Sequence, residues 1–276
     1  MNEAARPEPI ERIVVALDAS PQSVAALRAA VELAALMEAE LEGLFVEDIN
    51  LLRLCGFPFG QEVGSYTAQL RRLDNRGMER QLRIIAATIQ QAMERAATQT
   101  PVRWSFHVRR GPVVEELLAA AQSAALLSLG RAGRVRRKGI GSTAQSLVSQ
   151  AQRPLLIAGE GNGLQFPLTV VYTGSEAAQR ALELAVRLSH QELERLRVVV
   201  WDGGDAALDA AQLEKAARRL VETALPDAGQ GMGFVTVTHA ASLVETLHSL
   251  NSGTLVLPRE QAALIAQHSG PALLVP

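Results

Sequence analysis

The sequence predicts an α/β protein built as two tandem, open, five-stranded parallel sheets with helices on both faces. Short apolar segments of strand length alternate with longer segments that carry apolar residues at helical spacing, which is typical of a parallel sheet covered by helices. This order occurs twice along the 276 residues. A glycine-rich segment, 159–163, separates the two occurrences, so we expect one domain over 1–160 and a second over 166–276.

The first half begins with an apolar, β-branched strand at 13–17, followed by a helix at 20–37. Segment 45–54 carries apolar residues at helical spacing, and two interpretations stay open for it: a lid or partner surface, or a buried connection. The other predicted strands of this half are 41–46, 102–108, 125–129 and 155–158, and the other predicted helices are 65–98, one that opens at 111–112, and 141–150.

The second half repeats the pattern in a shorter form. Its last strand, 272–275, and the last strand of the first half, 155–158, each end a half as an apolar edge that invites pairing. We therefore expect these strands to lie near each other in an intramolecular pseudo-dimer, with a further homodimer left open. The predicted strands are 168–172, 196–201, 234–238, 254–257 and 272–275, and the predicted helices are 176–189, 206–224, 242–250 and 260–268.

Composition limits the function classes. The formal net charge of −2 gives no global attraction to nucleic acid or to an anionic membrane surface. No apolar run approaches the roughly 20 residues that a membrane-spanning helix needs, so membrane insertion is not expected. Residues 1–11 lack an apolar signal core, and Cys55 is the single cysteine, which together favour a cytoplasmic location without disulfides.

Two segments fall at the carboxyl ends of predicted strands, the edge where parallel sheets bind ligands. The first is Asp18, Ala19 and Ser20, directly after the first strand. The Asp18 carboxylate could accept hydrogen bonds from an adenine amino group or a ribose hydroxyl. Asp and Ser are also ordinary N-cap residues for the helix that follows, and taken alone the segment favours capping.

The second segment, 130–143, joins the fourth strand to a helix. Gly130, Gly133 and Gly141 allow the backbone to approach phosphates closely, and a helix N-terminus capped by Ser142 offers free N–H groups and a positive dipole end to an anion. The segment therefore predicts a phosphate site, and the alternative is a surface loop whose cations are merely solvated. Positive charge is added in the same place by Arg131, Arg134, Arg136, Arg137 and Lys138.

Together these segments resemble the universal stress protein family over the whole first half. Residues 14–20 are similar to its opening strand ending in Asp, and 111–118 to the start of one of its helices. Segment 130–143 resembles its ATP loop, Gly-x2-Gly-x9-Gly-Ser/Thr, with seven residues in place of nine between Gly133 and Gly141. By this resemblance Asp18 would hold the adenosine end and Val46 would touch the base. The resemblance assigns the nucleotide to Asp18, Ala19, Ser20, Val46, Gly130, Arg131, Gly133, Gly141, Ser142 and Thr143.

The resemblance implies a Rossmann-like, adenine nucleotide alpha hydrolase-like fold. It also implies a stress-response or regulatory protein that binds ATP or ADP, with or without Mg²⁺, and acts through nucleotide-dependent contacts with an unknown protein partner. The alternative is a nucleotide-free scaffold of the same fold. A third class, an ATP-hydrolysing enzyme, is not expected, because the chain has no P-loop lysine. Weak ATP hydrolysis stays open. No catalytic residue and no metal site are assigned.

The second half resembles the same domain without its site. Aligning the first strands puts Thr173 at the position of Asp18. The fourth strand runs through Pro258 and Arg259 almost directly into a helix, with no glycine loop, and Glu260 places a negative charge where a phosphate would lie. The sequence therefore predicts one nucleotide per chain, bound by the first half.

Overall fold

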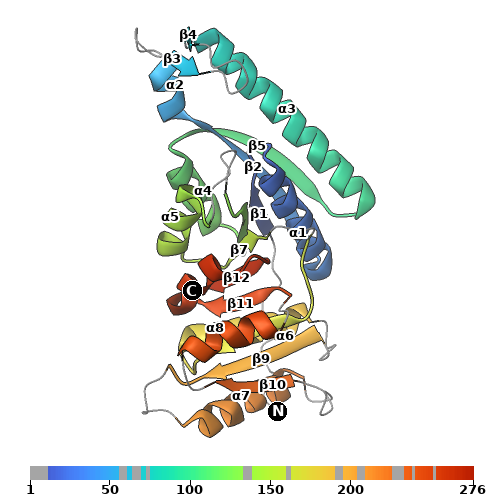
Figure 1. Ribbon diagram of the computed structural model, residues 1–276. Coiled ribbons are helices and arrows are strands. Elements are labelled where there is room, and N and C mark those ends of the chain that lie inside the picture. The colour runs from blue at the N-terminus through green and yellow to red at the C-terminus, as the bar shows by residue number, and fades with distance from the viewer. Residues whose placement is uncertain are drawn as a thin grey trace.

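The structure is a computed structural model, and a single ten-stranded sheet runs through it from end to end (Figure 1). The sheet has the order β10-β9-β8-β11-β12-β7-β6-β1-β2-β5. The described residues are 12–55, 61–63, 70–72, 75–132, 139–159, 163–189, 195–203, 209–225, 233–237, 240–250 and 253–276.

The first half supplies five strands of this sheet and a separate hairpin. Its sheet strands are β1 (Arg12–Ala16), β2 (Glu40–Asp48), β5 (Trp104–Gly111), β6 (Leu126–Gly130) and β7 (Leu155–Ala158). The hairpin strands are β3 (Gln61–Val63) and β4 (Leu70–Arg72). The helices are α1 (Pro21–Met37), α2 (Ile49–Cys55), α3 (Asn75–Gln99), α4 (Val113–Gln122) and α5 (Ser142–Gln150).

The second half supplies the other five strands. They are β8 (Leu168–Tyr172), β9 (Leu196–Trp201), β10 (Gly233–Val237), β11 (Leu255–Pro258) and β12 (Ala272–Val275). The helices are α6 (Glu176–Leu188), α7 (Ala210–Ala224), α8 (Ala240–Ser249) and the 3₁₀ helix η2 (Arg259–Gln267).

Each half has its strands in the same spatial order. With the hairpin left out, the sheet strands numbered along the chain within a half have the order 3-2-1-4-5 in both, and their pairings within a half are all parallel. In this order the sheet grows in opposite directions from the first strand, which leaves a crevice at the carboxyl ends of the first and fourth strands. In the first half these strands are β1 and β6.

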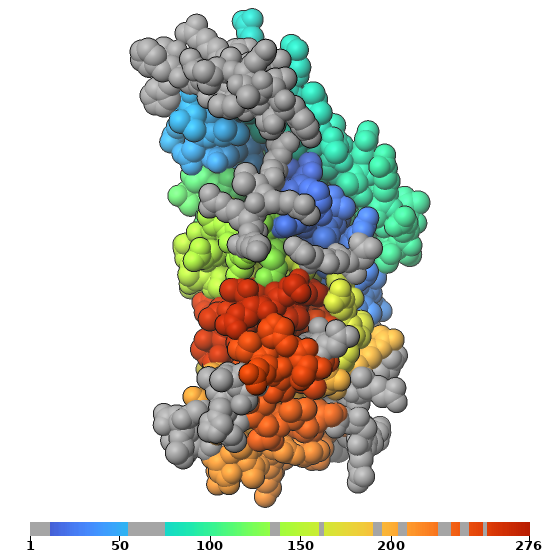
Figure 2. All heavy atoms as spheres, in the orientation of Figure 1, coloured from blue at the N-terminus to red at the C-terminus, as the bar shows by residue number. Residues whose placement is uncertain are grey.

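The two halves meet through their last strands. β7 and β12 pair antiparallel, with Leu156 opposite Leu273, and both side chains are almost fully buried. The predicted nearness of these strands is confirmed, and the pairing merges the two expected five-stranded sheets into one. Figure 2 shows the red C-terminal residues packed directly against the yellow-green end of the first half, with the orange remainder of the second half beyond them.

Apolar side chains alternate between the two faces of the sheet and build a core on each. In β1, Ile13 and Val15 belong to the core under α1, α3, α6 and α7, whereas Val14 belongs to the core under α4, α5, α8 and η2. The period of two along a strand divides these side chains between the faces. Among the described residues, no helix is both long and apolar enough to cross a bilayer.

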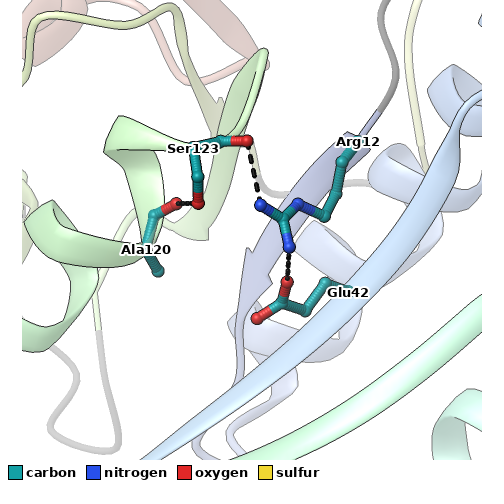
Figure 3. A network of polar contacts seen from close by, with 4 residues as sticks. All are labelled: Arg12, Glu42, Ala120 and Ser123. Carbon is teal, nitrogen blue, oxygen red and sulfur yellow. Dashed lines mark hydrogen bonds and ion pairs between the residues drawn. The ribbon is translucent and has the colours of Figure 1, made fainter.

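A partly buried ion pair fixes the amino end of β1. Arg12 Nη1 lies 2.9 Å from Glu42 Oε2 in β2, and its Nη2 donates to the carbonyl oxygen of Ser123 after α4, also at 2.9 Å (Figure 3). Glu42 is only 4% exposed, so its charge needs this partner. The contacts hold β1 between β2 and α4, which positions the opposite end of the strand, where Asp18 follows.

The segment between β2 and β5 departs from prediction. The helix predicted over 65–98 begins only at Asn75, and residues 70–72 pair instead with 61–63 in the antiparallel hairpin. Helical propensity is a weak preference that such pairing overrides. In segment 45–54 the first four residues end β2, and the helical spacing beyond them produces α2. Phe45 is buried and Leu52 packs on the core, whereas Leu51 and Leu54 are 38% and 53% exposed, so the segment is buried only in part. Figure 1 places α2 and the hairpin at the end of the molecule farthest from the second half, and α3 runs from that end past β5 toward α1.

Candidate functional site

A cavity of about 480 Å³ lies at the carboxyl ends of β1 and β6. This is the point in the first half where the sheet grows in opposite directions, and it is where open α/β sheets bind ligands. Its walls come from the exits of β1 and β6, from β2, and from the first turns of α4 and α5. Eight of the predicted site residues line it, namely Asp18, Ser20, Val46, Gly130, Arg131, Gly141, Ser142 and Thr143.

Two predicted site residues are not among those lining the cavity. Ala19 lies in the turn between its lining neighbours, and its φ of 60° puts it in the left-handed region, so that the turn directs Asp18 and Ser20 to the wall. Gly133 lies outside the described residues, as do the basic residues 134–138.

The turn after β1 combines capping with a carboxylate at the cavity. Ser20 is the N-cap of α1, and its Oγ accepts a hydrogen bond from the backbone N–H of Ser23 at 3.1 Å. The backbone N–H of Ser20 donates to Asp18 Oδ1 at 2.9 Å. The capping interpretation is therefore confirmed for Ser20, while Asp18 is oriented by its own turn and presents a carboxylate to the cavity.

The start of α5 forms the opposite wall. The predicted cap by Ser142 is wrong, because the N-cap is Gly141, which has no side chain to accept a hydrogen bond from the first turn. The first N–H groups of a helix have no partner within the helix, and here they begin at a cavity wall, where an anion could accept from them. A Cβ at Gly141 would lie 3.2 Å from the Cα of Ala132, so this close approach favours glycine.

Gly130 is required for a second close approach. A Cβ there would lie 2.9 Å from the carbonyl carbon of Gln22 in α1. The side-chain oxygen of Gln22 also accepts a hydrogen bond from the backbone N–H of Ala132. Sequence reasoning missed Gln22, because nothing in a local pattern marks a side chain that bonds a backbone more than a hundred positions away.

The apolar part of the wall was also missed. Leu44, Val113, Leu117 and Leu129 join Val46 around the cavity. Leu44 stands two residues before Val46 in β2, so the period of two places it on the same face of the strand. That signal was present in the sequence, whereas the contribution of α4 depends on how the helix packs across the sheet.

The family is decided by the match to known sequences. The family model described as "Universal stress protein family" matches residues 9–159, more than half of the chain. The chain belongs to the universal stress protein family. The matched region contains every residue of the cavity wall. A search of curated proteins finds no match.

Solved structures share the fold of this universal stress protein along nearly its whole length. A universal stress protein from Archaeoglobus fulgidus DSM 4304 has 15% identity and a TM-score of 0.65, over 95% of this chain and 97% of that one. A functionally unknown protein from Pseudomonas aeruginosa PAO1 has 13% identity and a TM-score of 0.56, over 96% and 92%. At these identities the likeness concerns the fold alone.

Arg131 differs from the sequence-based expectation. Its backbone follows β6 at the cavity, but its guanidinium, which was expected to add positive charge for phosphates, points to the second half. Nη1 donates to the carbonyl oxygen of Ile265 at 2.7 Å, and Nη2 donates to that of Gly270 at 2.8 Å. A single sequence does not tell which cation of a basic loop faces a ligand and which faces a neighbouring part of the chain.

The corresponding place in the second half carries its own carboxylate. Ser175 is the N-cap of α6, and Gly174 before it has φ 79°, so the turn matches the one through Ala19. Glu260, at the start of η2, accepts hydrogen bonds through Oε1 from the hydroxyls of Ser175 and, at 3.3 Å, Thr173. A negative charge thus lies beside the helix start.

The described residues contain no cluster of metal-binding side chains. Among the described residues, no three or more His, Cys, Asp and Glu side chains lie close enough together to hold a metal ion.

His268, between η2 and β12, makes stability depend on pH. Burial first, and then the nearby charge of Arg131, lower its pKa from the usual 6.5. The unfolded state therefore binds this proton at a higher pH than the folded state does, so stability should fall as the pH drops from about 6.5 through the lower folded pKa. His268→Gln should reduce the loss of urea stability between about pH 7.5 and about pH 5.5. An unchanged pH dependence in this variant would contradict the assignment.

Proposed function

We propose that this universal stress protein binds one adenine nucleotide, ATP or ADP, in the first-half cavity and acts in the cytoplasm as a nucleotide-dependent regulator of a protein partner in a stress response. One observation carries the proposal: the Asp18 carboxylate and the start of α5, whose N-cap Gly141 has no side chain to cap it, line the same cavity at the crevice of the sheet. Carboxylates bind amino and hydroxyl groups, and helix starts bind phosphates.

The cavity suits a nucleotide in size and lining. Its volume of about 480 Å³ lies within the range usual for small-molecule sites, and such sites are mostly apolar with a few placed polar groups. Leu44, Val46 and Leu117 offer an apolar surface to the base. Any Mg²⁺ would enter with the phosphates and keep several waters, because the described residues offer no three-ligand cluster for it.

The proposal assigns one site to each chain. In the second half, Thr173 replaces the carboxylate of Asp18, and Glu260 already accepts hydrogen bonds from the hydroxyls at the start of α6. A nucleotide phosphate would have to displace this carboxylate and then lie beside like charge. We therefore propose that residues 166–276 are a degenerate copy of the domain that binds no nucleotide and packs on the first as an intramolecular pseudo-dimer.

Asp18→Asn tests the site. Asparagine keeps an oxygen for the N–H of Ser20, so the turn is retained while the negative charge is lost. Losing a charge-assisted hydrogen bond costs about 1.5–3 kcal/mol, so ATP affinity should fall roughly ten- to a hundred-fold. Calorimetric titration should give a stoichiometry near one for the unsubstituted protein.

Thr173→Ala is the matched control, because it alters the equivalent position of the second half. It should leave both affinity and stoichiometry unchanged. A stoichiometry near two, or equal losses in the two variants, would contradict the one-site assignment.

The second candidate function is a nucleotide-free scaffold that acts through protein contacts alone. Two observations favour it: only seven residues separate Gly133 from Gly141, and the guanidinium of Arg131 is committed to the second half. Absence of any ATP or ADP binding by the purified protein would support it. We propose no catalytic role, and ATP turnover above the buffer background would contradict that part.

A further inference from the structure

We infer that Arg131 is a positioning residue through which the second half contributes to nucleotide affinity in the first. The inference rests on the proposed function and deepens it, since it states how the site is regulated. In this arrangement the second half holds the phosphate side of the cavity in place and binds no nucleotide itself.

The side chain of Arg131 ties the exit of β6 to the second half. The residue is only 7% exposed, and its two Nη atoms donate to two backbone carbonyls, those of Ile265 and Gly270, in the segment that leads from η2 into β12. The planar fork of a guanidinium fixes the relative positions of two such acceptors. A side chain without this fork would leave at least one buried carbonyl without its partner.

The backbone around Arg131 ties the same point to the phosphate side of the cavity. The carbonyl oxygen of Arg131 accepts a hydrogen bond from the N–H of Gly141, the N-cap of α5, at 2.8 Å. The N–H of the next residue, Ala132, donates to the side chain of Gln22 in α1. The backbone and side chain of Arg131 thus connect the start of α5 with the second half.

The acceptors in the second half are themselves firmly held. Gly270 packs so closely on Gly159 that a Cβ on Gly159 would lie 2.4 Å from the carbonyl carbon of Gly270. Ile265 is fully buried, and β12, which follows, pairs with β7 of the first half. The exit of β6 therefore cannot shift relative to the second half without breaking buried contacts.

The direction of the Arg131 side chain indicates that it positions the cavity wall and does not itself bind the phosphates. Both Nη atoms of Arg131 donate to backbone carbonyls of the second half, which directs the guanidinium toward that half, so we assign its effect on a phosphate to the wall that it fixes. A wall held in its binding geometry before the ligand arrives costs less ordering on binding. Because coupling between sites is reciprocal, a bound nucleotide should in turn stabilise the segment from Ile265 to Gly270.

The test compares ATP with adenosine, which lacks phosphates. Both ligands are titrated by calorimetry into the unsubstituted protein and into Arg131→Gln and Arg131→Lys. ATP affinity should fall about tenfold in both variants, a change within the usual range of coupling between two sites. Adenosine affinity should change less than about twofold. The base side of the cavity, at Asp18 and Val46, does not depend on Arg131. Thermal unfolding monitored by circular dichroism shows whether each variant is folded.

Arg197→Gln is the matched control. Arg197 Nη1 also donates to a backbone carbonyl, that of Leu250 at 2.8 Å, but within the second half and away from the cavity. This variant should bind ATP like the unsubstituted protein. A comparable loss of ATP affinity in it would overturn the inference, because any lost arginine contact would then have the same effect.

Amide hydrogen exchange of the unsubstituted protein gives a second measurement that needs no variant. ATP should slow exchange across 265–272, and adenosine should not. Unchanged exchange with ATP would overturn the inference.

The remaining outcomes are also decisive. If Arg131→Lys binds ATP as well as the unsubstituted protein does, charge alone acts on the phosphates. If ATP and adenosine lose affinity equally, the variants are generally destabilised. Either result overturns the inference but leaves the proposed nucleotide site in place. If the unsubstituted protein binds neither ligand, the proposed function fails and this inference fails with it.

Discussion

Gly141→Trp should reduce ATP binding by at least about a hundredfold, which corresponds to roughly 2.7 kcal/mol. A Cβ at this position lies 3.2 Å from the Cα of Ala132, and both residues line the cavity, so the indole starts from the cavity wall at the start of α5. There it would occupy space that the phosphates need and would keep them from the backbone N–H groups of the first turn. Calorimetric titration with ATP measures the loss directly.

Gly233→Trp is the control for this substitution. A Cβ at Gly233, at the start of β10, meets no atom within 4 Å, and the residue is exposed. The same side chain can therefore be accommodated at the far end of the sheet, and ATP binding should be unchanged. Nearly full affinity in Gly141→Trp would show that the phosphates do not lie at the start of α5.

Gly159→Ala should destabilise the protein by about 3 kcal/mol, the upper end of the usual cost of overpacking. The added Cβ would lie 2.4 Å from the carbonyl carbon of Gly270 and 2.5 Å from the nitrogen of Pro271. Both are backbone atoms next to β12, so they cannot rotate away as a side chain could. The free energy of unfolding in urea reports the change.

Gly233→Ala serves as the comparison for this stability measurement. Its Cβ has open space, so the substitution should change the free energy of unfolding by no more than about 0.5 kcal/mol. Equal effects of the two alanine substitutions would show that the close approach of Gly159 to Gly270 does not limit how the halves pack.

Much of the fold could be predicted because its strands carry a strong local signal. The bounds of β8, β9 and β12 agree with the predicted strands at every residue, since each is a mostly apolar run that neighbouring elements largely bury. The places of Asp18 and Gly130 at the cavity follow from the same signal, whereas Val46 was assigned by the family resemblance. Once a strand is located, the residues after it must lie at the carboxyl edge of a parallel sheet.

The parts that could not be predicted depend on contacts distant in sequence. The hairpin strand β4 lies in a segment of helical composition and owes its conformation to pairing with β3. Glu42 is a charged residue in a buried strand, and it is explained only once Arg12 is seen beside it. The direction of the Arg131 side chain follows from the packing of the second half, which a local pattern does not encode.

The antiparallel pairing of β7 with β12 has a consequence for how the protein responds to dilution. The two strands belong to one polypeptide, and only residues 159–167 separate the end of β7 from the start of β8. A short tether keeps its two ends at an effective concentration in the millimolar range, far above the abundance of most proteins. The pairing of the two halves, and with it the contact that Arg131 makes to the second half, therefore forms in every molecule whatever the expression level.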